Sequence, residues 1–195
     1  VWGESATSLV AQFIAVLDNR ARALIAFTPV CGNCTTKFDE NHEKFEWSRQ
    51  NWLSIDLSTV PVRELAVRMS RLHEGEGPVV VEGGAAVSYV TRMRKKYASD
   101  WSNQVFILQR KLEAQFNEQR LPAKYLKVPT LFVIAKDDEV PMCELATNRR
   151  CFDLIDAPKQ LTEITGGHFG LGYRGTEPYA QAMGAAIKFL HSTFG

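Results

Sequence analysis

Residues 1–13 read VWGESATSLVAQF, in which a serine separates two apolar residues from an amphipathic run. This is the pattern of a buried strand tip that turns sharply into a helix at Ser5. A serine on so tight a turn takes a strained backbone conformation, so the residues two before and two after it must be small. Gly3 meets this requirement fully and Thr7 meets it in part. The pattern therefore predicts a turn that presents the Ser5 hydroxyl at the edge of a sheet.

The same turn predicts a place for negative charge. The backbone N–H of Ala6 would face the position where an oxyanion forms, near the positive end of the new helix. A G-x-S-x-small match arises by chance in many chains, so the motif needs partners elsewhere in the sequence before Ser5 becomes a candidate nucleophile.

Helical and strand patterns alternate around this turn. Residues 6–18 carry apolar side chains on one helical face, and residues 23–28 (ALIAFT) form a continuous apolar run, as in strands buried on both faces. This order predicts an α/β fold with a doubly wound, mostly parallel sheet. The later elements that we expect are a strand at 130–135 (TLFVIA), a helix at about 142–155, a strand at 160–165 and a helix at 177–194.

The middle of the chain has a different composition. It is rich in charged and aromatic residues, and residues 62–72 and 104–119 read as helical patches. We therefore predict a mostly helical insertion between two parts of one core. The predicted boundaries are 1–31 for the first core part, 32–127 for the insertion and 128–195 for the second core part.

Composition narrows the classes of partner. The chain has 195 residues, 45% of them hydrophobic, which is enough for one sizeable core. Its net charge is +1, and the nearest basic cluster, formed by Arg92, Arg94, Lys95 and Lys96, is better explained as a solvated helix face than as a phosphate site. No apolar run reaches the roughly eighteen residues of a membrane span. We expect neither a nucleic-acid partner nor a membrane span, and the sequence leaves the compartment open.

The four cysteines suggest two kinds of chemistry that we weigh and set aside. Cys31-Gly-Asn-Cys34 has the spacing of a redox or zinc pair, but it follows a loop-like stretch instead of opening a helix. Cys143 and Cys151 lie too far apart in sequence for a second zinc-ribbon pair. Incidental thiols are the favoured interpretation, with a local disulfide or metal chemistry as alternatives. No metal or cofactor is expected.

A serine nucleophile needs a base and an orienting acid. Among the four histidines, His168 is the best placed, because it follows a predicted strand in the glycine-rich stretch EITGGHFGLG. His42 and His73 fall in the insertion, and His191 reads as a surface or packing residue of the last helix. The acid would come from the acidic run at 137–139, directly after TLFVIA. We expect at least two of these three carboxylates to face water.

The three motifs together resemble the α/β-hydrolase superfamily. Ser, Asp and His each follow a predicted strand, in that chain order, where ligands of such sheets bind. VWGESAT resembles the nucleophile elbow, VPTLFVIAKDDEVP the acid-bearing strand and EITGGHFG the histidine loop, over residues 1–30 and 126–195. The resemblance implies Ser5 as nucleophile, His168 as general base and Asp138 as orienting acid, with Asp137 as the fallback. It also implies that the Ala6 N–H supplies half of the oxyanion hole.

The resemblance implies a serine hydrolase that acts on an ester-like bond of a small-molecule acyl substrate without a cofactor. An acyltransferase, a carbon–carbon bond hydrolase on a polyketide-like substrate, and a non-catalytic binding protein of the same fold are the alternatives. An N-terminal segment, or a second chain of the same fold, is expected to supply the earlier strands and the second oxyanion donor. A homodimer is also compatible with the sequence.

The insertion resembles the cap that such hydrolases carry between these two parts of the core. Trp47, Trp52 and Trp101 are candidates to line a substrate pocket, although packing explains any single one of them equally well. Trp2, next to the serine turn, is expected in the core.

Overall fold

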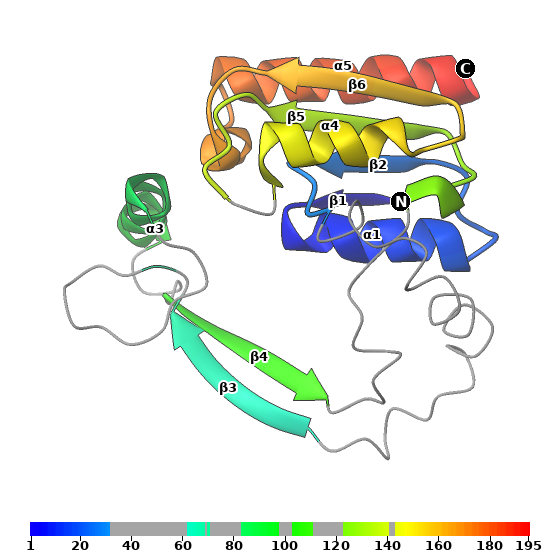
Figure 1. The fold of residues 1–195 in the computed structure, drawn as a ribbon. Helices are drawn as coiled ribbons and strands as arrows, with labels where there is room; N and C mark the ends of the chain where they lie inside the picture. Colours follow the sequence, from blue (N-terminus) through cyan, green and yellow to red (C-terminus); the bar gives the residue numbers. More distant parts are fainter. Residues whose placement is uncertain (32–61, 69, 71–82, 98–102, 111–122, 141–142) are drawn as a thin grey trace. The chain divides into compact units, whose positions relative to one another are not determined.

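The computed structural model divides the chain into two compact units, and each is described by itself (Figure 1). One unit comprises Val1–Trp52 with Glu118–Gly195, and the other comprises Leu53–Asn117. The boundaries predicted at residues 31 and 127 stay predictions. The structure describes residues 1–31, 62–68, 70, 83–97, 103–110, 123–140 and 143–195.

The first unit is built on a four-stranded parallel sheet. Its strands are ordered β1-β2-β5-β6, so that β1 is an edge strand of the described sheet. Trp2 pairs with Ile25, Leu24 with Thr130, and Thr130 with Lys159. The predicted α/β fold with a parallel sheet is confirmed. The strands are β1 (Trp2–Glu4), β2 (Leu24–Phe27), β5 (Thr130–Ala135) and β6 (Lys159–Ile164).

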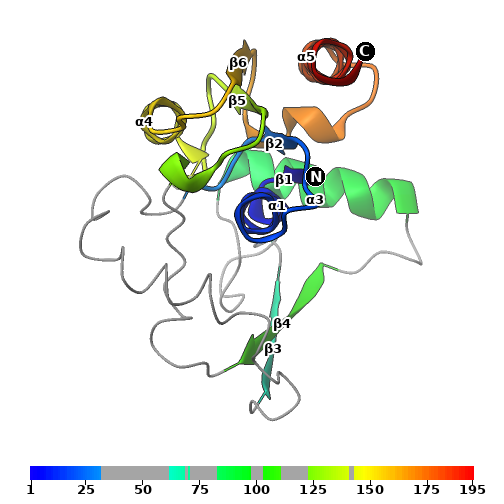
Figure 2. The ribbon, with the colours of Figure 1, turned by 90° about the vertical axis from the view of Figure 1, so that its right-hand side faces the viewer.

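Helices cover both faces of this sheet (Figure 2). Alternate residues of a strand point to opposite faces, so a strand covered on both sides must be apolar throughout. Leu24 and Phe132 pack toward α1 and α4, whereas Ile25 and Leu131 pack toward α5. Among the described residues, none of the helices has the length and apolar character needed to cross a membrane. The helices are α1 (Ala6–Leu17), α4 (Leu145–Asp153) and α5 (Glu177–Phe194), with short 3-10 turns η4 (Ala123–Tyr125) and η6 (His168–Gly172).

The second unit corrects a prediction. Strands β3 (Val62–Arg68) and β4 (Gln104–Arg110) form an antiparallel pair, so the helices predicted to begin at residues 62 and 104 are wrong over these residues. The two strands pair over seven positions, from Val62 with Arg110 to Arg68 with Gln104. Pairing with a partner satisfies the backbone groups that a helix would satisfy internally, and it overrides the local helix propensity of VRELAVR.

The same unit contains α3 (Gly84–Tyr97), which carries the basic cluster. Arg92, Arg94, Lys95 and Lys96 are all exposed. This agrees with the interpretation of the cluster as a solvated helix face.

Trp2 is not a core residue, contrary to the prediction. It is 54% exposed and contacts Phe27 edge to face, with the ring centroids 5.0 Å apart. Because β1 is an edge strand, Trp2 has a strand neighbour on one side within the described sheet. One covered flank is too little to bury so large a side chain.

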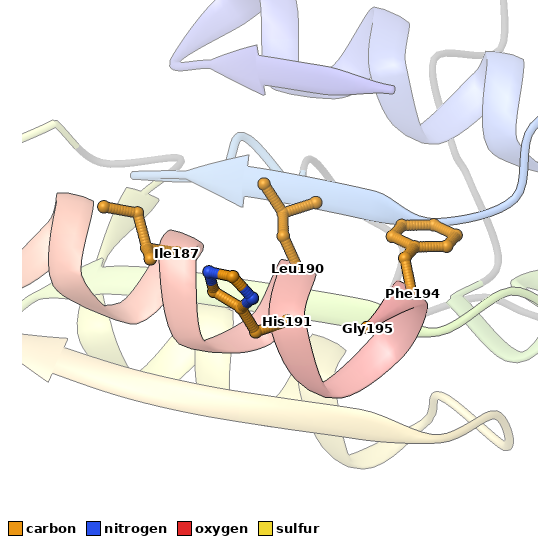
Figure 3. A pocket seen from close by; sticks show the side chains of 5 residues that line it. All are labelled: Ile187, Leu190, His191, Phe194 and Gly195. Atoms are coloured by element: carbon orange, nitrogen blue, oxygen red, sulfur yellow. The ribbon is translucent and has the colours of Figure 1, made fainter.

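Apolar side chains are also exposed on the C-terminal half of α5 (Figure 3). Ile187, Leu190 and Phe194, together with His191 and Gly195, line a surface pocket of about 390 Å³. This half of α5 lies toward the amino ends of the parallel strands, whereas the loop that carries His168 follows the carboxyl end of β6 (Figure 1). His191 is exposed, as predicted, and belongs to this pocket.

Candidate active site

Ser5 alone makes the turn between β1 and α1, because β1 ends at Glu4 and α1 begins at Ala6. Its backbone has φ 52° and ψ −127°, a region that residues with a side chain rarely occupy. The sheet and the helix hold it there. The Ser5 N–H donates to the carbonyl of Phe27 at 3.0 Å, and the Ser5 carbonyl accepts from the N–H of Ser8 at 2.9 Å. The strain expected from the sequence is therefore present, and it coincides with the candidate nucleophile.

Gly3 and Thr7 fit this turn for different reasons. A Cβ at position 3 would lie 2.3 Å from the carbonyl oxygen of Thr7, which is far inside contact distance, so glycine is required there. Thr7 occupies the second small-residue position. Its hydroxyl accepts from the backbone N–H of Glu4 at 3.0 Å and donates to the Glu4 carbonyl at 2.7 Å. The threonine thus satisfies both backbone groups of the residue before the nucleophile.

A buried polar pair anchors the turn to the chain beyond β2. The Ser8 hydroxyl donates to the Ser5 carbonyl at 2.5 Å and accepts from the N–H of Val30 at 2.9 Å. The Gln12 amide donates to the carbonyls of Ser8 and Val30 at 3.2 and 3.1 Å. Sequence reasoning missed both residues. They lie with Ala11 and Ala15 on the buried face of α1, whereas Val10 and Ile14 of the apolar stripe indicated by the sequence are 57% and 39% exposed. The hydrophobic pattern therefore gave no signal for Ser8 and Gln12.

The structure brings Ser5, His168 and Asp138 together. His168 begins η6, two residues beyond Gly166, and its Nε2 lies 2.7 Å from the Ser5 hydroxyl oxygen. Its Nδ1 lies 3.0 and 3.1 Å from the two carboxylate oxygens of Asp138. The side chains of His168 and Asp138 are 5% and 0% exposed. With its proton on Nδ1 facing the carboxylate, the imidazole presents a lone pair on Nε2 to the serine hydroxyl.

Asp137 and Glu139 are exposed, as expected for two of the three acidic residues, whereas the Asp138 side chain is buried. Asp138 faces the imidazole, and its carboxylate also accepts from the N–H of Val140 at 3.0 Å. The fallback residue, Asp137, is exposed, and its backbone N–H donates to the Gly166 carbonyl at 3.1 Å. Glu139 does more than face water, because its carboxylate accepts from the backbone N–H of His168 at 2.9 Å. Two of the three carboxylates therefore bond to the histidine, and the bond from the exposed Glu139 to its backbone N–H was not predicted.

A cysteine lies beside the acid and the histidine. Within the described part of the chain, the Cys143 thiol and the polar atoms of Asp138 and His168 lie within 4.8 Å of one another, the set that could offer ligands to a metal ion. Burial raises the pKa of the Cys143 thiol well above its ordinary value, and the charges of Asp138 and Glu139 add to this rise. The contact between the imidazole and the carboxylate accounts for the proximity of His168 and Asp138.

Glu4 precedes the candidate nucleophile in the sequence, and its carboxyl interacts electrostatically with His168. Although the residue keeps an exposed face, desolvation of its carboxyl raises its pKa above the ordinary value of 4.5, and the electrostatic interaction with His168 opposes this rise. The ionised form of Glu4 is thus disfavoured in the folded state relative to the unfolded chain.

Glu4→Gln is expected to raise the free energy of unfolding at pH 7 and to leave it unchanged well below pH 4.5. A carboxyl whose pKa is raised by folding contributes its full stability below the unfolded pKa, and this contribution is lost as the pH rises through the folded pKa. Urea unfolding at several pH values measures the difference. Glu144→Gln, at an exposed position before α4, is the matched control. A stability gain of equal size at every pH would contradict the prediction.

The other predicted site residues divide into two groups. Ala6 is the first residue of α1, and the first amides of an α-helix lack acceptors within the helix. This position suits the predicted oxyanion donor, and the role stays a prediction. Trp47, Trp52 and Trp101, the candidates for a substrate pocket, lie outside the described residues.

Comparisons with known proteins place the fold. The chain is similar to the α/β hydrolase GrgF from Penicillium sp. sh18, with a TM-score of 0.55 and 17% identity over 98% of this chain and 62% of the other. The match to DcsB, solved in complex with its substrate analogue, has a TM-score of 0.59 and 19% identity, and it covers 98% of this chain and 63% of DcsB. The match to a monoacylglycerol lipase from Paleococcus ferrophilus has a TM-score of 0.53 and 15% identity, and it covers 97% of this chain and 67% of the lipase. The chain thus spans about 62% of the first of these proteins. No family model and no curated protein sequence matches it.

Proposed function

Because the chain has part of the α/β-hydrolase fold, we propose that it is a serine hydrolase that cleaves an ester-like bond through Ser5, His168 and Asp138. The observation that carries the proposal is the 2.7 Å contact between His168 Nε2 and the hydroxyl of a serine on a strained turn. The other ring nitrogen of the same histidine meets the buried carboxylate of Asp138. This relay of nucleophile, base and acid is the arrangement that activates a serine for acyl transfer.

In the proposed reaction the Ser5 oxygen attacks the carbonyl carbon of the substrate while His168 Nε2 accepts the serine proton. Negative charge develops on the carbonyl oxygen, and the Ala6 N–H at the start of α1 stabilises it. The tetrahedral intermediate then expels the alcohol or thiol, which takes the proton back from His168. This leaves an acyl group on Ser5.

The second half of the reaction uses the same residues in reverse. His168 removes a proton from water, the water oxygen attacks the acyl carbonyl, and the Ser5 oxygen leaves with the proton. Asp138 keeps the imidazole proton on Nδ1 and stabilises the charged imidazolium throughout. These steps require no cofactor. The proposed substrate is a small molecule with a carboxylic ester, lactone or thioester bond.

A fluorophosphonate is expected to add covalently to Ser5, because it reacts with activated serines as an ester carbonyl would. Intact mass before and after treatment measures the adduct, and peptide mapping locates it. Ser8 is an internal control on the same peptide: it is buried and bonded to two backbone groups, and it should stay unlabelled. An unlabelled Ser5 in the folded protein would contradict the proposal and favour a non-catalytic binding protein.

A further inference from the structure

Two consecutive carboxylates of the loop between β5 and α4 bond to two different parts of His168. Asp138 contacts the imidazole Nδ1 at 3.0 Å, and Glu139 Oε2 accepts from the backbone N–H of the same histidine at 2.9 Å. We propose that Glu139 is a positioning residue, which fixes the main chain of the histidine loop so that the imidazole lies between Ser5 and Asp138. This inference rests on the proposed function of the triad.

The main-chain contacts around this pair show why a side chain is needed. The first residues after β5 continue its backbone pairing with the chain beyond β6. The Lys136 N–H donates to the Ile164 carbonyl at 3.0 Å, and the Asp137 N–H donates to the Gly166 carbonyl at 3.1 Å. At Gly166 the backbone turns with a φ of +82° and leaves the strand direction. The next amide of this loop that bonds to the acid loop belongs to His168, and its acceptor is the Glu139 carboxylate. Glu139 thus extends the connection beyond the point where backbone pairing ends.

Gly167 makes room for this carboxylate. A Cβ at position 167 would lie 2.4 Å from Glu139 Oε2 and 3.1 Å from the carbonyl oxygen of Asp137. The carboxylate therefore lies against the face of Gly167 that a side chain would occupy. Glycine is favoured at the two positions before the histidine for different reasons. Gly166 has a positive φ, which residues with a side chain rarely adopt, and a side chain at Gly167 would overlap the carboxylate of Glu139.

The two carboxylates control different degrees of freedom. The bond from Asp138 sets the rotation and the tautomer of the ring, whereas the bond from Glu139 holds the backbone from which the ring projects. A bond from an amide to an ionised carboxylate is shorter and stronger than one to a neutral acceptor. An imidazole moved by about 1 Å loses its alignment with the serine, and such misplacement costs about 100-fold in rate.

Steady-state kinetics with p-nitrophenyl acetate provides the first test. Glu139→Ala is expected to lower kcat by about 10- to 100-fold and to leave KM within about twofold, because the reacting groups are misaligned while substrate binding is unchanged. Glu139→Gln keeps an acceptor oxygen and is expected to stay within about fivefold of the wild type. Glu144→Ala is the matched control, since Glu144 is exposed and makes no capping bond to α4. A kcat in Glu139→Ala equal to that of the control would overturn the proposal.

Proton NMR provides a readout that does not need turnover. The low-field resonance of the proton between His168 Nδ1 and Asp138 should be present in the wild type, in Glu139→Gln and in Ser5→Ala, and absent or broadened in Glu139→Ala. Its persistence in Glu139→Ala would overturn the positioning role. If Ser5→Ala left turnover unchanged, the proposed hydrolase function would fail, and the NMR comparison would still decide whether Glu139 holds His168.

Discussion

Ser5→Ala is expected to lower turnover of activated esters by about 10⁴- to 10⁶-fold and to abolish fluorophosphonate labelling, because it removes the hydroxyl that His168 Nε2 contacts at 2.7 Å. The hydroxyl is the atom removed, and the residue keeps its Cβ and its backbone. Both main-chain bonds of residue 5, to Phe27 and from Ser8, are available to alanine. The free energy of unfolding, measured in urea, should therefore change little.

The control for this variant is Ser192→Ala. Ser192 is an exposed serine of α5, and its hydroxyl donates to the Phe189 carbonyl within the helix. Removal of this hydroxyl should leave kcat and labelling at the wild-type level. Turnover retained in Ser5→Ala, with the protein folded, would show that the nucleophile lies elsewhere in the chain.

Asp138→Asn is expected to lower kcat by about 10⁴-fold with little change in the fold. The amide has nearly the shape of the carboxylate, but its NH₂ group can donate to Nδ1. This would move the imidazole proton to Nε2, which then could not accept the proton of Ser5. The lost negative charge would also leave the imidazolium unstabilised in a buried site, where His168 is 5% exposed.

The neighbouring Asp137→Asn is the matched control, because it is the same chemical change one residue away. Asp137 is exposed and contributes its backbone N–H, which the substitution keeps, to the contact with Gly166. Its kcat should remain within about twofold of the wild type, as for other surface changes away from reacting groups. Inactivation by Asp137→Asn together with activity in Asp138→Asn would reverse the assignment of the acid.

Much of the core could be predicted from the sequence because its signals are local. TLFVIA predicts a strand at residues 130–135, and β5 spans Thr130–Ala135, since a strand covered by helices on both faces must be apolar at every position. The helix predicted at residues 177–194 likewise coincides with α5, although Ile187 and Leu190 are exposed and Ala182 and Phe189 are buried. The meeting of Ser5, Asp138 and His168 could be expected because parallel strands bring their carboxyl ends to one end of the sheet. The roles given to them, and the choice of Asp138 over Asp137, came from the resemblance to α/β-hydrolases.

What the sequence did not predict depends on contacts between distant residues. The segment VRELAVR favours a helix locally, and its partner in β4 begins at Gln104, far along the chain. In the sequence, Glu139 is one of three consecutive acidic residues that could all be solvated. Its role becomes visible only in the folded chain, where its carboxylate accepts a hydrogen bond from the backbone N–H of His168. Gly167 carried a usable signal: a second glycine beside Gly166 suggests that something must approach the backbone closely.

The contact between His168 and Ser5 joins residues that are 163 positions apart in the chain. Closing so long a loop costs more chain entropy than forming a helix or a neighbouring strand pair, and such contacts are consolidated late in folding. A chain with its local helices formed but with β1 and β6 not yet joined in one sheet would lack the contact between Ser5 and His168. Under the proposed function, reactivity at Ser5 would therefore report completed folding of this unit, and a partly folded chain would not react with the fluorophosphonate.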